Sequence, residues 1–302
     1  MVKILSKNLF DHKGKHALNP YLVMAIAIIC ISFGSIFSKM SDAPAIIIAA
    51  YRLGFSSLLL LPFIFGKSWQ EFKSIKSSKV LWALLSGLFL ALHFATWVSS
   101  LKYITVSSSV VLVALQPVFV AVGSYLFLKE KIPIKALLAG LIALSGTFLI
   151  GAGDLQIGSK ALWGDFLAIS GAVFAAAYWI VGRSLRQSLS VTTYTFLVYT
   201  TSAVILFGFA YVQSIPLLAY DIKNWVLFFA LAIVPTLGGH SLFNWSLGYV
   251  QSIVVSISIL GEAVGATILA YFIFGEAPTF IELFGGIVIL LGLYLFIINN
   301  KQ

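Results

Sequence analysis

Glu262 is the residue of this sequence whose position most strongly suggests chemistry. It is the one carboxylate in SISILGEAVGATILAYFIF (residues 256–274), a stretch otherwise suited to a membrane interior. An ionisable group at that depth costs at least roughly 2.5 kcal/mol on insertion scales and by default marks a functional site. Because desolvation favours the neutral acid, Glu262 could bind and release a proton. The structural alternative is a protonated Glu262 that is hydrogen-bonded between helices, with Gly261 and Gly265 packing closely.

Gln116 occupies the equivalent place 146 residues earlier and is followed by Pro117. A proline inside a helix removes one backbone hydrogen bond and kinks the chain, which frees carbonyl groups at that depth. Gln116 and Glu262 together suit a central polar site, and we expect both to bind a small molecule. An interhelical hydrogen bond and a packing kink explain Gln116 and Pro117 equally well.

Histidine, asparagine and aromatic side chains gather in three further apolar stretches: His93 and Trp97; Tyr178 and Trp179; His240, Asn244 and Trp245. Side chains four residues apart share a helix face. Imidazole titrates in the physiological range, and aromatic rings stack on other rings or on cations. Taken singly, each aromatic residue is better explained by packing. Taken together with Gln116 and Glu262, the set predicts the lining of a binding cavity.

Arg52 is the basic residue placed deepest in an apolar stretch, AAYRLGFSSLLLLP. A guanidinium cannot lose its charge, so it must snorkel, pair with an acid or meet an anionic ligand. We expect Arg52 to have a structural or gating role rather than a direct ligand contact. Glu130 and Glu276 occupy equivalent places beside loops. They too are expected to be structural or to close a gate.

The composition determines which elements must hold these side chains. The 302 residues are 60% hydrophobic and 10% charged, with a mean hydropathy of +1.03, whereas ordinary soluble domains contain roughly 25% charged residues. The chain is therefore expected to be an all-α integral membrane protein, because only helices or closed barrels satisfy their backbone in lipid and the runs lack barrel alternation. Ten apolar runs predict ten transmembrane helices: 20–39, 43–65, 80–101, 106–128, 133–150, 162–182, 192–213, 224–247, 252–274 and 279–298.

The basic residues predict how the chain is oriented. With residues 1–19 as a cytoplasmic tail, fourteen of the 19 lysines and arginines fall on the cytoplasmic side. This bias follows the positive-inside rule and predicts that both termini are cytoplasmic, in the inner membrane of a prokaryotic cell. The net charge of +9 is thus explained by orientation, and no nucleic-acid partner is expected.

The chain also repeats itself at an offset of 146 residues. Tyr103 aligns with Tyr249, and Tyr125 with Tyr271, in one ungapped register. The repeats are predicted to be residues 20–150 and 162–298. Since each holds five helices, an odd number, the second copy would enter the membrane upside down, as in many secondary transporters.

Two motifs carry a resemblance to a known family. LQPVFVAVGSYLFLKEKI and EAVGATILAYFIFGEAPT, with the glycine-rich helix after each, resemble the EamA family of the drug/metabolite transporter superfamily. The resemblance implies a ten-helix carrier of small metabolites, often an exporter, which does not hydrolyse ATP. It also implies a cavity lined mainly by helices 1, 3, 4, 6, 8 and 9. The family usually has proline after the polar residue in both copies, whereas Ala263 follows Glu262 here. That difference predicts a second helix that kinks less easily.

The resulting hypothesis is a secondary active, proton-coupled exporter of amino acids or nucleoside-like compounds that works by alternating access. An importer or exchanger of the same superfamily is the alternative, and a passive channel ranks lower. An enzyme is not expected, because the sequence lacks GxxxxGK[ST], HExxH, CxxC and GxSxG motifs. The expected partners are a small-molecule substrate, the lipid bilayer and protons, with no metal or cofactor, in a monomer or weak homodimer.

Overall fold

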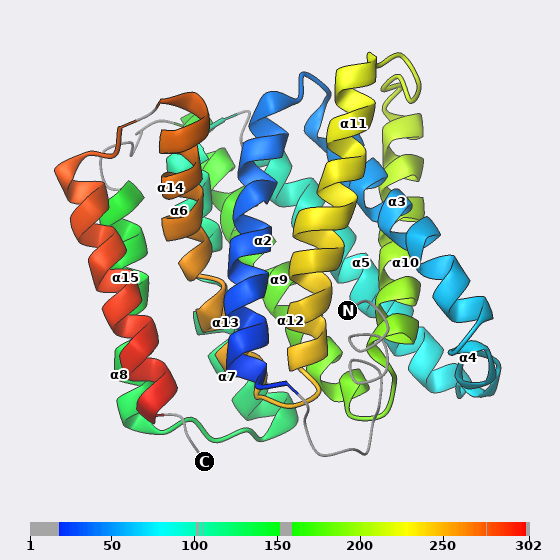
Figure 1. Cartoon of the computed structure of the whole chain (residues 1–302), viewed down its shortest axis with the longest axis horizontal. Coiled ribbons are helices and arrows are strands. Elements are labelled where there is room, and N and C mark those ends of the chain that lie inside the picture. The colour runs from blue at the N-terminus through cyan, green and yellow to red at the C-terminus, as the bar shows by residue number, and fades with distance from the viewer. Residues whose placement is uncertain (1–17, 101–102, 105, 152–158, 276, 300–302) are drawn as a thin grey trace. The chain divides into compact units, whose positions relative to one another are not determined.

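The computed structural model describes residues 18–100, 103–104, 106–151, 159–275 and 277–299. Within these residues all regular structure is helical (Figure 1). The elements are α2 (Pro20–Met40), α3 (Ala45–Phe65), α4 (Trp69–Ser74), α5 (Ser77–Ser100), α6 (Val106–Val113), α7 (Gln116–Gly123), η1 (Ser124–Leu128), α8 (Ile134–Gly151), α9 (Ser159–Arg186), α10 (Val191–Val212), α11 (Ile222–Leu231), η3 (Ala232–His240), α12 (Ser241–Ser246), α13 (Ser252–Ser258), α14 (Gly261–Phe274) and α15 (Phe280–Asn299).

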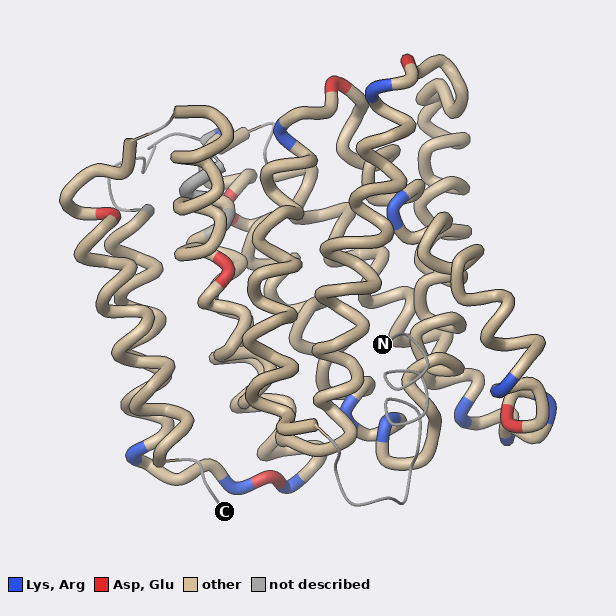
Figure 2. Tube along the Cα trace, viewed as in Figure 1, with Lys and Arg blue, Asp and Glu red and all other residues tan. Residues whose placement is uncertain are grey.

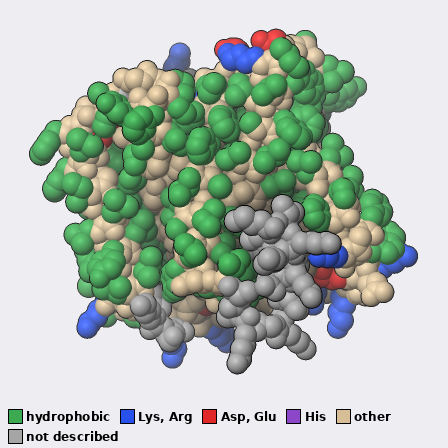
Figure 3. Space-filling view, viewed as in Figure 1, with side chains coloured by type: hydrophobic (Ala, Val, Ile, Leu, Met, Phe, Trp, Pro, Cys, Tyr) green, Lys and Arg blue, Asp and Glu red, His purple; other side chains and the backbone are tan. Residues whose placement is uncertain are grey.

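These helices are suited to a membrane. Nine stretches of the described chain are long and apolar enough to cross a bilayer, and Ile134–Ile150 is a shorter apolar helix. Large apolar side chains lie on the surface, among them Val212 and Phe272, each 77% exposed. Figure 3 shows such side chains covering much of the face in view, and Figure 2 shows charged residues mostly near helix ends. The prediction of an all-helical, multi-pass membrane protein is confirmed. The number of ten spans stays a prediction.

Side chains mark where several helices begin. Asn19 accepts a hydrogen bond from the backbone of Tyr21, and Ser190 accepts one from Thr193, as N-cap residues do. Asp221 begins α11 by accepting from the backbone and side-chain nitrogens of Asn224, at 2.9 and 2.7 Å. These hydrogen bonds lower the pKa of Asp221, since they favour the charged carboxylate.

The helices form two compact units. The first unit contains the described residues up to Ala91 together with Val181–Val250, and the second unit contains Leu92–Ile180 and the described residues from Gln251 onward. Helices α5 and α9 run through both units. Each unit therefore draws on both sequence halves, and the division of the chain into repeats at 20–150 and 162–298 stays a prediction.

In the first unit, α2 and α3 pack against the chain that runs from α10 to α12. Tyr51 on α3 stacks on Phe228 of α11 with ring centroids 5.0 Å apart and nearly parallel planes. Its hydroxyl donates to the carbonyl of Leu217 at 2.8 Å. This aromatic contact therefore links α3 to α11.

In the second unit, α8 and α15 make the closest helix pair (Figure 1). A Cβ on Gly146 would lie 2.6 Å from the carbonyl oxygen of Gly285 and 2.7 Å from the backbone nitrogen of Ile289. A Cβ on Gly292 would likewise overlap the backbone of Ala143. Lower numbers on α8 meet higher numbers on α15, so the two helices run antiparallel. Missing side chains let their backbones approach, as small residues do in membrane helix pairs.

The neighbouring glycines of α15 allow a direct test of this packing. Gly285→Ala places a methyl group 2.8 Å from the Gly146 carbonyl oxygen, and overpacking of this kind costs roughly 1–3 kcal/mol. Gly286→Ala meets only Val264 Cγ2 at 3.9 Å, so the higher helix propensity of alanine should leave stability unchanged or raised by up to ~1 kcal/mol. Thermal unfolding of both purified variants in detergent measures the difference. Equal melting temperatures would contradict the proposed backbone contact.

Candidate functional site

The span that contains Gln116 is interrupted in its middle. Helix α6 ends at Val113, and α7 begins at Gln116 after a two-residue turn. The backbone amides of Leu115 and Val118 bond to the carbonyls three residues before them, at 3.2 and 2.9 Å. Pro117 falls at the start of α7, where its missing N–H leaves no helical bond unmade. Gln116 is 5% exposed and begins the second half of this span.

The span that contains Glu262 is interrupted at the equivalent place. Helix α13 ends at Ser258, and α14 begins at Gly261 after Ile259 and Leu260. The amide of Glu262 bonds to the carbonyl of Ile259 at 2.8 Å, again three residues back. A turn of tight backbone bonds forms here without a proline, and the expected difference in how easily the two spans kink stays a prediction.

The two interruptions concern the pattern of hydrogen bonds alone. The backbone keeps right-handed helical dihedral angles at Leu115 and at Leu260, so each span continues as one helix that tightens just before Gln116 or Glu262. Both side chains belong to the second unit, in which α7 packs against α13. Ser124 and Ser252 share a hydrogen bond of 2.7 Å beside this contact. Glu262 is half-buried and the only acid of α14.

His93 and Trp97 form a stacked pair in the second unit. Their ring centroids are 5.9 Å apart, and their planes differ by 9°. His93 Nδ1 lies 2.9 Å from the carbonyl oxygen of Gly171 on α9, so Nδ1 carries the proton. A Cβ on Gly171 would lie 3.3 Å from Trp97 Cβ, which shows how closely α5 and α9 approach. The Trp97 indole Nε1 is buried without a hydrogen-bond partner among the described residues.

Tyr178 and Trp179 lie deeper in the same unit. They are 1% and 2% exposed, and their rings are 4.5 Å apart with planes tilted by 50°. Adjacent on α9, they pack against each other as core side chains do. Their predicted contact with substrate stays a prediction.

The remaining predicted residues of the cavity belong to the first unit. His240 ends the π-helix η3, and its carbonyl accepts a hydrogen bond from Asn244 Nδ2 at 2.9 Å. Trp245 is 3% exposed and packs with Val23 and Val191, and its indole lies 4.3 Å from the Tyr249 ring. The set predicted as one lining is thus divided between the two units.

Arg52 is buried in the first unit, 5% exposed. Its Nε donates to Thr236 Oγ1 at 3.0 Å, and Thr236 Oγ1 donates to the carbonyl of Leu231 at 2.8 Å. The guanidinium therefore contacts the hydroxyl of a residue inside η3, the stretch where the backbone leaves α-helical geometry. A structural role of Arg52 at this bend is consistent with the contact, and its gating role stays a prediction.

Sequence reasoning missed the polar network around η3. Tyr199, which is 0% exposed, shares a hydrogen bond of 3.0 Å with Ser241, and Ser241 also donates to the carbonyl of Thr236 at 3.2 Å. Single-turn π segments in helices frequently mark functional sites. The signal in the sequence was Pro235 followed by Gly238 and Gly239 inside an apolar run, which weakens regular helix formation.

Glu130 lies at a helix end, as predicted. Its Oε2 accepts a hydrogen bond of 3.0 Å from Ser252, the first residue of α13. The carboxylate therefore joins the end of one span to the start of another within the second unit. Glu276, its equivalent, lies outside the described residues. The gate-closing role of both stays a prediction.

The comparisons with known proteins agree with this architecture. The model of the EamA-like transporter family matches residues 18–152 and 162–298. A solved crystal structure, described only as that of a protein, superposes with a TM-score of 0.77 at 16% identity over 93% of this chain and 97% of its own. That likeness shows the fold alone.

Two curated relatives cover most of the chain. An uncharacterized transporter of Archaeoglobus fulgidus is 25% identical over 85% of this chain and 88% of its own length. A protein of Rickettsia bellii named S-adenosylmethionine uptake transporter is 25% identical over 84% of each chain. With its two family matches and its apolar helices, this chain belongs to the EamA-like transporter family of the drug/metabolite transporter superfamily and is a membrane transporter.

Proposed function

We propose that the protein is a secondary active transporter that exports small organic metabolites in exchange for protons. The observation that carries the proposal is the pair of tight turns at equivalent places in two spans, after which Gln116 and Glu262 lie. A polar or ionisable side chain at membrane depth is expected to face a cavity or a partner. Two such side chains at equivalent positions suit a binding site better than a packing requirement.

Glu262 is proposed to be the proton-coupling residue. It is the only acid of α14, and it is half-buried in an apolar span, where an ionisable side chain by default marks a functional site. Proton binding at Glu262 would then compete with substrate, which is the requirement for antiport.

The proposed substrate class follows from His93 and Trp97. Their parallel rings provide an aromatic surface, and the indole Nε1 of Trp97 is a buried donor without a partner among the described residues. A substrate with a planar ring and acceptor atoms would satisfy both features. Aromatic amino acids and nucleoside-like compounds have this chemistry.

Alternating access requires two halves of opposite orientation, and two observations support this arrangement. Helices α6 and α13 begin 146 residues apart, as do α8 and α15. Helices α8 and α15 run antiparallel, and Gly146 meets Ile289 as Gly292 meets Ala143. Gly146 and Gly292 are 146 positions apart, and so are Ala143 and Ile289. The same pair of equivalent positions therefore occurs twice in this contact, with the two helices interchanged, as in a two-fold interface.

Uptake is the second candidate function. The Rickettsia relative is named an uptake transporter for S-adenosylmethionine, a nucleoside with a cationic side chain. The planar ring of S-adenosylmethionine is adenine, and an adenine ring could also stack on the His93 and Trp97 pair.

Two experiments test the proposal as a whole. Untargeted comparison of metabolites inside and outside cells with and without the protein should reveal one small solute depleted inside; accumulation would favour uptake instead. The purified protein in proteoliposomes should then show saturable counterflow of that solute. Flux that rises linearly with concentration would indicate a channel and exclude the carrier.

Glu262→Gln should abolish transport driven by a pH gradient while leaving counterflow of substrate, because glutamine keeps the shape but cannot carry the proton. Proteoliposome flux with and without an imposed pH gradient measures both. Asp42→Asn is the matched control, since Asp42 is exposed and its carboxylate pairs with Lys223 near a helix end. Unchanged gradient dependence in Glu262→Gln would remove this residue as the proton site.

Trp97→Ala should raise the substrate dissociation constant by roughly twofold to tenfold, the range expected for loss of one aromatic stacking contact. Trp97→Phe keeps an aromatic ring and removes the N–H donor, so its substrate dissociation constant should lie between those of wild type and Trp97→Ala. Trp163→Ala is the control, because Trp163 is 50% exposed and stacks on Phe166. Wild-type affinity in Trp97→Ala would assign this indole to packing.

A further inference from the structure

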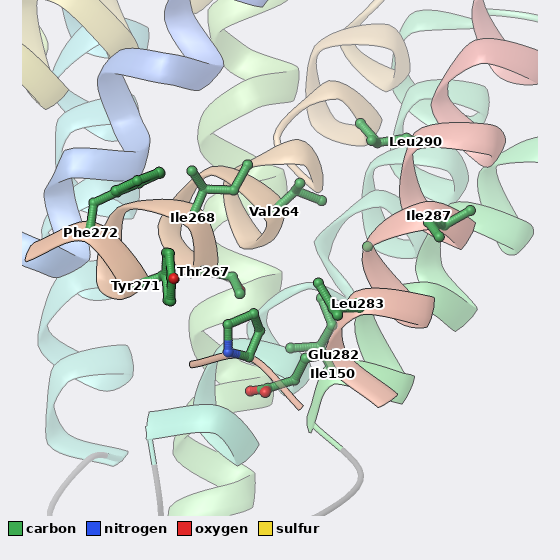
Figure 4. Close-up of a pocket in the computed structure, with 12 residues that line it drawn as sticks. Ile150, Val264, Thr267, Ile268, Tyr271, Phe272, Glu282, Leu283, Ile287 and Leu290 are labelled. Atoms are coloured by element: carbon green, nitrogen blue, oxygen red, sulfur yellow. The ribbon is translucent and has the colours of Figure 1, made fainter. Parts of the chain in front are cut away.

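The second unit carries a groove between α14 and α15 that is lined mostly by apolar side chains (Figure 4). Its walls include Val264 and Ile268 of α14 and Leu283 and Ile287 of α15. Ile268 is 52% exposed and Ile287 63%, so in a bilayer this surface meets lipid. A polar metabolite needs hydrogen-bonding groups, and these must therefore be sought elsewhere, among the buried polar side chains.

The first unit holds such a group in the indole of Trp245. This side chain is 3% exposed, and its Nε1 has no hydrogen-bond partner among the described residues. Buried polar groups are normally hydrogen-bonded, so a donor that is left unpaired requires an explanation. The Trp97 indole has the same property in the second unit. An acceptor atom of a bound substrate would pair with such a donor, and Trp245 therefore offers a substrate contact within the first unit.

Two arginines at the end of α9 hold the chain that carries Trp245. Arg186 Nε donates to the carbonyl of Asn244 at 2.9 Å, and Arg183 Nη1 donates to the carbonyl of Leu247 at 2.7 Å. Carbonyls in the last turn of a helix lack partners within the helix and carry partial negative charge, which cations stabilise. Because the Asn244 carbonyl belongs to the peptide unit that precedes Trp245, Arg186 fixes the backbone directly beside the indole.

The guanidinium of Arg186 is enclosed by the protein. Arg186 is 4% exposed. A Cβ on Gly248 would lie 3.2 Å from Arg186 Nη2, so the absence of a side chain there leaves room for the guanidinium. Arg186 Nη1 also donates to the carbonyl of Leu189, in the turn between α9 and α10. One side chain thus joins this turn to the end of α12.

Glu71 on α4 supplies the opposite charge. A buried guanidinium keeps its charge and is stabilised by an acid nearby, and Glu71 is the acid whose charge acts on Arg186. Glu71 Oε1 accepts a hydrogen bond of 2.6 Å from the backbone nitrogen of Ser190, and Oε2 accepts one of 2.7 Å from Thr193 Oγ1. Ser190 is the N-cap of α10, a helix of 22 residues, so the carboxylate lies where a helix favours negative charge. These bonds keep the carboxylate in place beside the α9–α10 turn.

We propose that Arg186 is a positioning residue for substrate binding, with Glu71 as its countercharge. Arg186 holds the backbone at Asn244 so that the Trp245 N–H is presented to an acceptor atom of the substrate. The proposal rests on the proposed function, because it takes Trp245 to contact the substrate. Lysine keeps the charge of arginine but not its planar set of donors, so it can replace Arg186 only in part.

Isothermal titration calorimetry of the purified full-length protein in detergent tests the proposal, with S-adenosylmethionine and phenylalanine as probes of the two proposed substrate classes. Trp245→Ala should raise the dissociation constant of the bound probe roughly twofold to tenfold, the range for loss of one aromatic contact. Arg186→Gln should raise it by at most the same factor, and Arg186→Lys by less. Lys73→Gln is the matched control, because Lys73 is an exposed cation on α4 that lies 4.6 Å from the centre of the Trp69 ring.

Double variants separate positioning from general destabilisation. If Arg186 acts through the Trp245 indole, Arg186→Gln should add nothing to the effect of Trp245→Ala. The same change should multiply the effect of Trp97→Ala, because Trp97 belongs to the other unit. If Arg186→Gln does not fold, as judged by gel filtration and circular dichroism, Glu71→Gln takes its place in both double variants, with a smaller rise expected.

Multiplied effects in both double variants would overturn the proposal, and so would wild-type affinity in folded Arg186→Gln. An unchanged dissociation constant in Trp245→Ala, with a raised one in Trp97→Ala, would overturn it and leave the proposed function intact. If wild type bound neither probe, or if Trp97→Ala had no effect, the proposed substrate class would itself be contradicted, and this proposal with it.

Discussion

The absence of water in hydrocarbon is the constraint on which this structure depends. Every backbone N–H and C=O at that depth must bond within the protein, so the spans are helices and any break must replace the bonds it loses. At Leu115 and at Glu262 the replacements are bonds to the carbonyl three residues back. The change in hydrogen bonding is therefore limited to a short turn. A polar side chain lies at that turn, Gln116 in one span and Glu262 in the other. The candidate site is a consequence of how the backbone remains satisfied.

The same solvent changes what holds the helices together. Apolar surface gains little by leaving lipid for protein, so close backbone approach and buried hydrogen bonds take the place of a hydrophobic core. Gly146, Gly285 and Gly292 let α8 and α15 approach to backbone contact. In the first unit, hydroxyl groups link the helices. Arg52 donates a hydrogen bond to the hydroxyl of Thr236, and the hydroxyls of Ser241 and Tyr199 share another. The costly guanidinium is placed where the π-helical stretch supplies polar partners.

The compact units and the sequence repeats divide the chain differently, and this difference has a physical meaning. Helices α6 to α8 recur as α13 to α15 at an offset of 146 residues, yet all six belong to the second unit. Equivalent pieces from the two halves thus pack on each other, α8 on α15 and α7 on α13, as well as on their sequence neighbours. Helices α5 and α9 run through both units.

The sequence by itself determined the membrane class, the helical content and the approximate spans, because hydropathy is a local property. It also predicted a site at Gln116 and Glu262, from the internal repetition and from the lone acid in an apolar run. It also indicated that His93 and Trp97 share a face, since side-chain spacing on a helix is fixed. Only the tertiary structure decided that a tight turn precedes Glu262 although no proline is present, that Tyr178 and Trp179 are buried against each other, and that Arg52 bonds to Thr236 in a π-helix. These facts depend on which helices approach one another and how closely, and such distances arise from contacts between residues far apart in the chain.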